Sequence, residues 1–512
     1  MFLLLLTVAI ILIFYHVSTQ YSRRGRILNK LPGPSTFPLI GNLPLFMCSS
    51  TKLWKVLRGL TKKYYPISRI WILHYSVVYL SHPDDAEILL SSMKHIEKSR
   101  LYDFLHPWLK TGLLTSTGKK WQHRRKMLTP AFHFNVLQQF LDIFVEQGNN
   151  LVKNLKSQGD ETIQNVVPLF TKYTLNTICE TAMGTVLHEA DIQNSYRTAL
   201  TKLVEIMLYR AFRPWLHNKW IFKLLSNGKE YEKYLSVLHN FSRKIIKERK
   251  EYHEETENQY LKSISTNNQL ISSVVVDDDG IKGQKKRMAM LDHLIAAQKF
   301  GKQIDDEGIR EEVDTFIFEG HDTTAMAMCF AVLMLAEHKD VQDRVRKEVD
   351  YLLDGKNGKI TSAEVQNMNY LEQCIKETLR LYPSVPFIAR KVNEDLQLKH
   401  CFIPAGTIVD LHIFDLHRDP NFWPNPEKYD PDRFLPEKMH NRHPFSYVPF
   451  SGGPRNCIGQ RFAMLELKAL LAHLIYNFIF EPIDNSQDII FTADLVLRTE
   501  SPIRVKFISR IK

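Results

Sequence analysis

A single cysteine stands in a bent, glycine-rich loop directly ahead of an apolar stretch with helical periodicity. The loop extends from Phe450 to Gly459 with the sequence FSGGPRNCIG, and Cys457 lies near its end. Amide dipoles at the start of a helix lower the pKa of a thiol and stabilise a thiolate there. Glycines let a flat ligand approach the backbone, and Arg455 adds a nearby cation. This pattern indicates a thiolate offered to the iron of a planar, acidic cofactor, which means haem.

A second tract places acidic and hydroxyl side chains inside an apolar helical pattern. It extends from Glu312 to Thr324 with the sequence EVDTFIFEGHDTT. Burying such groups is unfavourable unless they have a partner or a task. Glu319 and Thr323 share a helical face because they are four residues apart, and Asp322 beside them can deliver protons. A threonine here can also bond back to a carbonyl and open the helix to water. Taken alone, the tract fits a buried bending or capping network equally well.

Together, the two tracts resemble the haem-binding loop and the oxygen-activating helix of the cytochrome P-450 monooxygenases. The second tract is similar to that of family four, and the chain resembles an arthropod member of that family. In the cysteine loop, Gly452 stands where relatives often carry alanine. The resemblance covers residues from about 31 to the C-terminus. It implies that Cys457 binds the metal and that Phe450 and Gly459 contribute to the cofactor site. Asp322 and Thr323 would be the catalytic residues that manage protons.

The same resemblance implies further contacts with the cofactor, which would be haem b (iron protoporphyrin IX). Most other families carry alanine or glycine where Glu319 stands, and in family four this glutamate is commonly ester-linked to a haem methyl. The two haem propionates suit fork-shaped, charge-assisted donors. The residues expected to bind them are Trp121, Arg125, Arg390 and Arg455.

A buried structural triad is expected behind the cofactor. Glu377 and Arg380 are three residues apart and share a helical face, and such a pair alone is weak. The resemblance adds Arg433 as a third member. The triad would lock the core and take no part in the reaction.

The resemblance implies insertion of one atom of O₂ into a C–H bond of a lipophilic substrate, such as a fatty acid, terpenoid or xenobiotic. No dinucleotide-binding glycine motif follows a strand, and no phosphate-binding loop is found. Electrons from NADPH would therefore arrive through NADPH-cytochrome P-450 reductase, with cytochrome b5 as a further partner. Two alternatives are a haem-thiolate peroxide isomerase or dehydratase and a non-catalytic haem sensor. The Asp322–Thr323 pair argues against the first alternative.

Composition favours one large domain at a membrane. The chain has 512 residues, of which 44% are apolar, and no linker, repeat or low-complexity block divides it. The net charge of +11 comes from scattered basic residues among 56 acidic ones. That distribution suits anionic lipid and an acidic protein partner, not nucleic acid. The six cysteines form no CxxC pair, so neither zinc binding nor a disulfide framework is indicated.

The first 20 residues carry no charged side chain and are mostly apolar, and Arg23, Arg24, Arg26 and Lys30 follow. This pattern predicts a transmembrane signal-anchor in a thin bilayer, that of the endoplasmic reticulum, with the catalytic domain in the cytosol. A cleaved signal peptide is the alternative, but no basic segment precedes the apolar one and no cleavage site follows it. The expected organisation is an anchor at 1–20, a basic and proline-rich hinge at 21–34, and a cytochrome P-450 catalytic domain at 35–512.

The periodicity predicts a mainly α fold with a minor β region. Short strands are expected at 67–73, 77–80 and within 385–414, and an alternating strand pair at 489–508. The connection at 212–222 contains Trp215 and Trp220 and is expected to touch the bilayer, the alternative being a core-packed loop. An exposed loop is expected at 263–283. Helices are expected after Pro83 and at 121–127, 135–157, 165–183, 194–212, 228–250, 288–299, 307–337, from about 361 to 382, and from 460 to 478.

Overall fold

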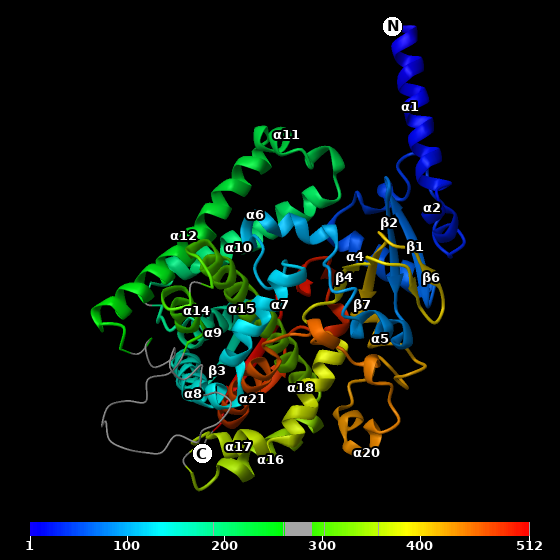
Figure 1. Ribbon diagram of the computed structural model, residues 1–512. Helices are drawn as coiled ribbons and strands as arrows, with labels where there is room; N and C mark the ends of the chain where they lie inside the picture. Colours follow the sequence, from blue (N-terminus) through cyan, green and yellow to red (C-terminus); the bar gives the residue numbers. More distant parts are fainter. Residues whose placement is uncertain (188, 260, 262–288, 302, 357, 511–512) are drawn as a thin grey trace.

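The computed structural model describes residues 1–187, 189–259, 261, 289–301, 303–356 and 358–510. Helices dominate the described chain, and the strands form small sheets gathered mainly at one side of the molecule (Figure 1). The predicted class, mainly α with a minor β region, is confirmed. The loop expected at 263–283 lies outside the described residues.

The long central helix α15 (Asp306–Glu337) organises the helical part. Asp305 caps it by accepting a hydrogen bond from the Gly308 amide at 2.8 Å, and acidic residues in the first turn oppose the helix dipole. Between 308 and 336 every residue is buried except Glu319, Gly320 and Thr323. The helix packs against α9 (Val166–Thr181), α12 (Ser226–Glu255), α18 (Asn369–Leu381) and α21 (Gln460–Asn477).

The predicted helices are found close to their expected positions. The others are α5 (Pro83–Ser91), α7 (Gly118–Leu128), α8 (Phe134–Lys156), α10 (Ala190–Ala211), α14 (Met290–Lys299) and α17 (Ser362–Asn367). Helix α4 (Ser50–Lys63) was not predicted. A further helix, α16 (Lys339–Leu353), was not predicted. Its buried stripe consists of Val341, Val345, Val349 and Leu353 at four-residue spacing, within an otherwise charged sequence. That stripe is the signal by which it could have been found.

A four-stranded sheet forms one wall of the interior. Its order is β1 (Ile67–Ile72), β2 (Tyr75–Leu80), β7 (Ile408–His412) and β4 (Phe387–Lys391), and β2 pairs with β7 in parallel. Alternation sends Val409 and Leu411 into a smaller core beneath the sheet. Ile408 and Tyr79 point to the opposite face and join the main core. The two-stranded sheet of β5 (Leu396–Gln397) and β6 (Phe402–Ile403) completes this region.

The C-terminal strands pair differently from the prediction. Only β9 (Phe491–Thr492) and β10 (Arg498–Thr499) pair within the tail. The last strand, β11 (Arg504–Ser509), instead pairs with β3 (Glu161–Asn165) and β8 (Phe478–Pro482). The expected single strand pair over 489–508 is therefore wrong in its partners, because alternation reports which residues face the core and not which strand lies alongside.

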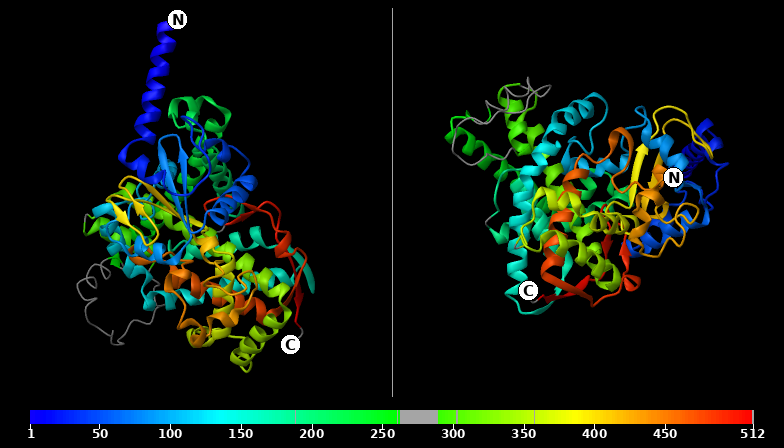
Figure 2. Two further views of the ribbon diagram at one scale, coloured as in Figure 1. Left: turned by 90° about the vertical axis from the view of Figure 1, so that its right-hand side faces the viewer. Right: turned by 90° about the horizontal axis from the view of Figure 1, so that it is seen from below.

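The N-terminal helix α1 (Phe2–Gln20) projects from the body of the molecule (Figures 1 and 2). Among the described residues it is the one helix long and apolar enough to cross a membrane. The short helix α2 (Arg23–Leu28) follows it and is held on the domain, because Leu28 is fully buried and Arg23 pairs with Asp395 at 2.6 Å. Helix α11 (Lys219–Leu224) lies on the same side of the molecule as α1.

Candidate active site

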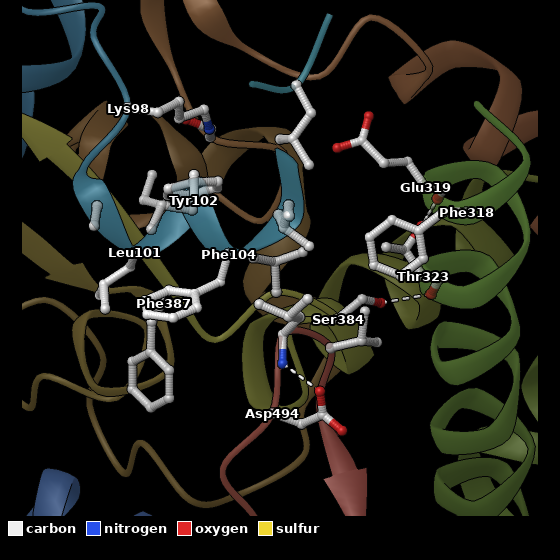
Figure 3. Close-up of a pocket in the computed structure, with 18 of the residues that line it drawn as sticks. Lys98, Leu101, Tyr102, Phe104, Phe318, Glu319, Thr323, Ser384, Phe387 and Asp494 are labelled. Carbon is white, nitrogen blue, oxygen red and sulfur yellow. Dashed lines mark hydrogen bonds between the residues drawn. The ribbon is translucent and has the colours of Figure 1, made fainter. Parts of the chain in front are cut away.

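A cavity of about 680 Å³ lies between α15, the inner face of the four-stranded sheet and the loop that carries Cys457. Its walls are mostly apolar, and Figure 3 shows aromatic and aliphatic side chains such as Phe104, Phe318 and Phe387 around it. The half-buried residues of α15, Glu319, Gly320 and Thr323, all line this cavity. These three residues are the part of α15 that is exposed to the cavity, whereas their neighbours on the helix are buried.

The cysteine loop is shaped by its own backbone. The Cys457 amide donates a hydrogen bond to the Phe450 carbonyl at 2.9 Å, which closes the loop ahead of α21. Gly453 has a φ of +66°, and a Cβ there would lie 2.0 Å from the Leu90 carbonyl oxygen of α5. Only glycine fits this position. A Cβ on Gly459 would lie 3.9 Å from the Cys457 sulfur, so the absence of a side chain leaves the approach to the thiol open.

Cys457 is exposed to the cavity, yet desolvation by the surrounding protein dominates its ionisation. Desolvation raises the pKa of Cys457 to about 11, with a further upward contribution from Glu319, although the Gly459 amide and Arg125 act in the opposite direction. The Gly459 amide at the start of α21 therefore acts in the expected direction, but desolvation outweighs it. A cation that binds the sulfur directly would stabilise the thiolate far more than the helix does.

Two of the expected propionate-binding residues hold the cysteine loop. Arg125 of α7 donates to the Asn456 carbonyl at 2.7 Å and to its side-chain oxygen at 2.8 Å. Arg455 donates to the Ile96 and Leu114 carbonyls at 3.1 and 2.7 Å. Its guanidinium carbon lies 5.0 Å from the ring centre of Trp121, a cation–π contact.

The cavity also contains a half-buried basic residue that sequence reasoning missed, Lys98. It lines the cavity and pairs by an isolated β-bridge with Arg390, which is 2% exposed. Burial, together with Arg390 and Arg455, lowers the pKa of Lys98 well below its usual value. No local sequence pattern marks this lysine, because its partners come from distant segments.

These cations lack a protein counter-ion. In the described part of the chain, Lys98, Arg390 and Arg455 have no carboxylate within ion-pair distance, and the Arg390 Nη1 atom is buried without a hydrogen-bond acceptor. Burial lowers the pKa of Arg455 to about 9, which shows how unfavourable the cluster is on its own. A ligand with two carboxylates and a central metal would satisfy both the cations and the thiol, so the residues present fit haem.

Thr323 and Glu319 face the cavity from one side of α15, as predicted. The Thr323 hydroxyl donates to the Glu319 carbonyl at 2.7 Å, and the Ser384 hydroxyl donates to the Thr323 carbonyl at 2.7 Å (Figure 3). Glu319 reaches into the cavity, and Lys98 lies across it. Burial raises the pKa of Glu319 to about 7, although Lys98 and Arg455 oppose the rise.

Asp322 does not line the cavity with its neighbours. It is buried, and Arg498 of β10 donates to both of its carboxylate oxygens. His321, to which no chemistry was assigned, is also buried and lies 2.6 Å from the Ile317 carbonyl oxygen.

The predicted structural triad is present. Arg380 donates to both oxygens of Glu377 at 2.7 and 2.8 Å, and neither side chain is exposed. The Arg433 Nε atom lies 3.4 Å from the same carboxylate. The remaining Arg380 donors bind the carbonyls of His417, Pro426 and Lys428. The triad therefore ties α18 to the segment that leads to Cys457.

Comparisons with known proteins agree with this geometry. The family model described as Cytochrome P-450 matches residues 31–507. The chain is 40% identical to cytochrome P-450 4c3 of Drosophila melanogaster, over 99% of this chain and 94% of that protein. It is 38% identical to cytochrome P-450 4c21 of Blattella germanica, over 97% of both chains. It is 37% identical to cytochrome P-450 4V2 of Homo sapiens, over 95% of this chain and 91% of the human one.

Proposed function

The chain belongs to the cytochrome P-450 family and is a haem-thiolate monooxygenase, and we propose that it oxidises a C–H bond of a lipophilic substrate with one atom of O₂. The observation that carries the substrate class is the mostly apolar cavity, which extends from the Cys457 loop to the four-stranded sheet. Such walls bind aliphatic or aromatic groups by burial. Fatty acids, terpenoids and lipophilic xenobiotics all meet this description.

We assign the residues that hold the cofactor as follows. Cys457 would bind the iron, and Phe450 and Gly459 shape the loop around it. When bound, haem supplies oxygen activation, which the thiolate ligand favours. The propionates would be held by Lys98, Trp121, Arg125, Arg390 and Arg455. Glu319 would form an ester with the macrocycle, which would remove its buried charge.

Thr323 and Asp322 would manage protons. The Thr323 hydroxyl lines the cavity, where it could accept a proton from water and donate one into the cavity. Asp322 adjoins it on α15 but is held by Arg498. The Asp322 carboxylate would therefore have to leave Arg498 during proton delivery. Until then the ion pair would keep it away from the cavity.

Electrons would come from another protein at the membrane. The exposed basic side chains of α7 include Lys119 and Lys126, and the same helix contacts the cysteine loop through Arg125. An acidic partner docked there would lie close to Cys457, which suits NADPH-cytochrome P-450 reductase or cytochrome b5. We infer an anchor at 1–20 in the endoplasmic reticulum membrane, a connecting segment at 21–34 and a cytosolic catalytic domain at 35–512. Nucleic acid has no part in this function.

The test combines a ligation assay with turnover. The wild-type protein should give the red-shifted ferrous–CO Soret band of a thiolate-ligated haem, and Cys457→Ser or Cys457→His should lose it. Retention of that band in either variant would rule out the ligand assignment. With added reductase, the wild type should consume NADPH and form a hydroxylated product. Conversion of a lipid peroxide without NADPH would favour the isomerase or dehydratase alternative, and haem binding without any product would favour a sensor.

A further inference from the structure

An acidic residue faces the cavity from the middle of its sheet wall. Asp410 lies on β7, where its neighbours across the sheet are Tyr79 of β2 and Ala389 of β4. All three line the cavity. Strand alternation places Asp410 on the same face as Ile408, which also lines the cavity, whereas Val409 points into the smaller core beneath.

The Asp410 carboxylate is buried without a full set of partners. Its side chain is 13% exposed, and its Oδ1 atom is buried with no hydrogen-bond partner in the described part of the chain. The His412 ring lies nearby, but its Nε2 atom is 3.9 Å from Oδ2, beyond hydrogen-bond distance. The Nδ1 atom of His412 already contacts the Thr61 hydroxyl at 2.6 Å. A buried polar atom in this state is unfavourable unless a ligand or solvent completes it.

A second cavity acid, Asp494, differs in this respect. It accepts a hydrogen bond from the Leu495 amide at 2.5 Å, and the Arg498 Nε atom lies 4.0 Å from its other oxygen (Figure 3). Both aspartates line the same cavity. Asp494 therefore serves as a matched comparison, an acid in the same apolar surroundings whose carboxylate already accepts a backbone hydrogen bond.

We propose that Asp410 is a specificity-determining residue that binds the hydroxyl group of an uncharged aliphatic alcohol in this cavity. The inference rests on the proposed function, because it names a substrate class for the same site. Burial raises the pKa of Asp410 to about 6, so both of its protonation states are accessible near neutrality. A hydroxyl group satisfies either state, because it donates to a carboxylate and accepts from a carboxylic acid.

Aliphatic ligands with other end groups fit the sheet wall around Asp410 less well than an alcohol does. An alkane leaves Oδ1 of Asp410 unpaired. A carboxylate would be repelled by the ionised form of Asp410. An amine would be attracted by Asp410, but it would bring a further charged group into mostly apolar surroundings. An alcohol therefore combines apolar burial along its chain with a hydrogen bond at its end.

Equilibrium dialysis of the haem-loaded full chain with dodecane, dodecanol, dodecanoate and dodecylamine tests this proposal. We expect the preference for dodecanol over dodecane to be about tenfold greater in the wild type than in Asp410→Leu. Asp410→Asn should keep that preference, because an amide still bonds to a hydroxyl, and should bind dodecanoate more tightly than the wild type. Asp494→Leu should leave the preference unchanged.

An unchanged dodecanol preference in Asp410→Leu, or tighter binding of dodecylamine than of dodecanol by the wild type, would overturn the inference. Each variant must retain the thiolate ferrous–CO band, and Asp410→Ala replaces the leucine variant if that one does not. Binding does not depend on turnover. A wild type that shows the Asp410-dependent preference but forms no product with NADPH and reductase would refute the proposed function and leave the inference standing.

Discussion

Arg498 holds Asp322 away from the cavity, with its Nη2 atom 2.6 Å from Oδ1 and 2.5 Å from Oδ2 of the carboxylate. Asp322 lies beside Thr323 on α15 and is buried, whereas Arg498 comes from a short strand near the C-terminus. The Nε atom of the same arginine lies 4.0 Å from Asp494, which lines the cavity. The arginine therefore links the acid of the predicted proton relay to a second acid at the cavity wall.

Replacement of Arg498 by glutamine should destabilise the fold by about 3 kcal/mol, because it leaves the buried Asp322 carboxylate without its partner. Denaturant unfolding of the haem-loaded protein measures the loss. The double variant Arg498→Gln/Asp322→Asn should recover part of it, because position 322 then carries no unpaired buried charge. Simple additivity of the two single changes would show that the pair is not coupled.

Thr323→Ala should change coupling more than binding. Its hydroxyl lies in the cavity, and loss of this group should leave uptake of electrons and O₂ intact while more peroxide is released per molecule of product. Peroxide and product yields per NADPH measure the effect. Thr323→Ser keeps the hydroxyl and should stay close to the wild type. An unchanged product yield per NADPH in the alanine variant would exclude the relay role.

Local sequence patterns located most of the fold and much of the site. The helix with Glu319 and Thr323, the Cys457 loop, and the Glu377–Arg380 pair are each contained within a short stretch of chain. Periodicity and spacing describe such stretches directly. Hence the predicted contact of Thr323 with a backbone carbonyl and the Glu377–Arg380 pair are both found. The third member of the triad, Arg433, was expected from the family resemblance and not from local spacing.

The residues that the sequence did not reveal depend on distant partners. Lys98 becomes a cavity cation only because β4 brings Arg390 beside it. Asp410 is a largely buried acid because β2 and β4 flank its own strand, although its neighbours in sequence indicate an ordinary apolar strand. The restraint of Asp322 by Arg498 joins residues 176 positions apart. No local periodicity contains such information.

Acidic pH should destabilise the first turn of α17, because it protonates Glu364. This residue caps the helix with Thr361, whose amide donates to it at 2.9 Å, and it pairs with Lys356. These contacts, the Lys356 pair first, lower the pKa of Glu364 from 4.5 to about 2. Because the pKa of Glu364 is lower in the folded state, its contribution to the free energy of unfolding is complete above the unfolded-state pKa of 4.5. That contribution is lost as the pH falls toward about 2.

Glu364→Ala should therefore reduce the free energy of unfolding by about 1 kcal/mol near neutral pH. The difference from the wild type should shrink as the pH falls through that window. Denaturant midpoints of both proteins over this pH range measure it, and Glu364→Gln retains a side-chain acceptor without the charge as a control. A difference that stays constant from neutral pH to acid would contradict the assignment.

The connection between α10 and α12 should contact the bilayer. Trp215 is 51% exposed, Trp220 is 82% exposed and Leu224 is 81% exposed, so these apolar side chains are not packed in the core. Helix α11, which carries Trp220 and Leu224, lies on the same side of the molecule as the projecting helix α1. Membrane interfaces favour tryptophan. A chain lacking residues 2–20 should therefore stay partly bound to vesicles, and the deletion stops there because Leu28 is fully buried.

Replacing both Trp215 and Trp220 with serine in that shortened chain should lower its partition into vesicles by about tenfold. Vesicle sedimentation measures the bound fraction. Tyr351→Ser is the matched control, since this aromatic residue is 86% exposed on α16, at the opposite end of the molecule. Equal release by the control and the double variant would mean that general surface polarity, and not this connection, sets the binding.

Glu319 should become ester-linked to haem during turnover. Its side chain faces the cavity and accepts no hydrogen bond from the described part of the chain, and burial raises its pKa to about 7. An ester would remove this buried charge and hold the cofactor rigidly, which matters because small misplacements of reacting groups slow catalysis strongly. The bond would join a carboxylate oxygen to a haem methyl carbon, with loss of one C–H bond. This two-electron oxidation requires the O₂ and NADPH of turnover, so resting enzyme is a poor test.

After turnover, acid denaturation followed by reversed-phase chromatography with mass detection should find haem attached to the wild-type polypeptide. Glu319→Ala should release all of its haem, and Glu319→Gln should do the same, because an amide cannot form the ester. Both variants should retain the thiolate ferrous–CO band, since Cys457 is unchanged. The alternative is a protonated glutamic acid bonded to a backbone carbonyl. Complete separation of haem from the wild-type chain after turnover would establish that alternative and exclude the ester.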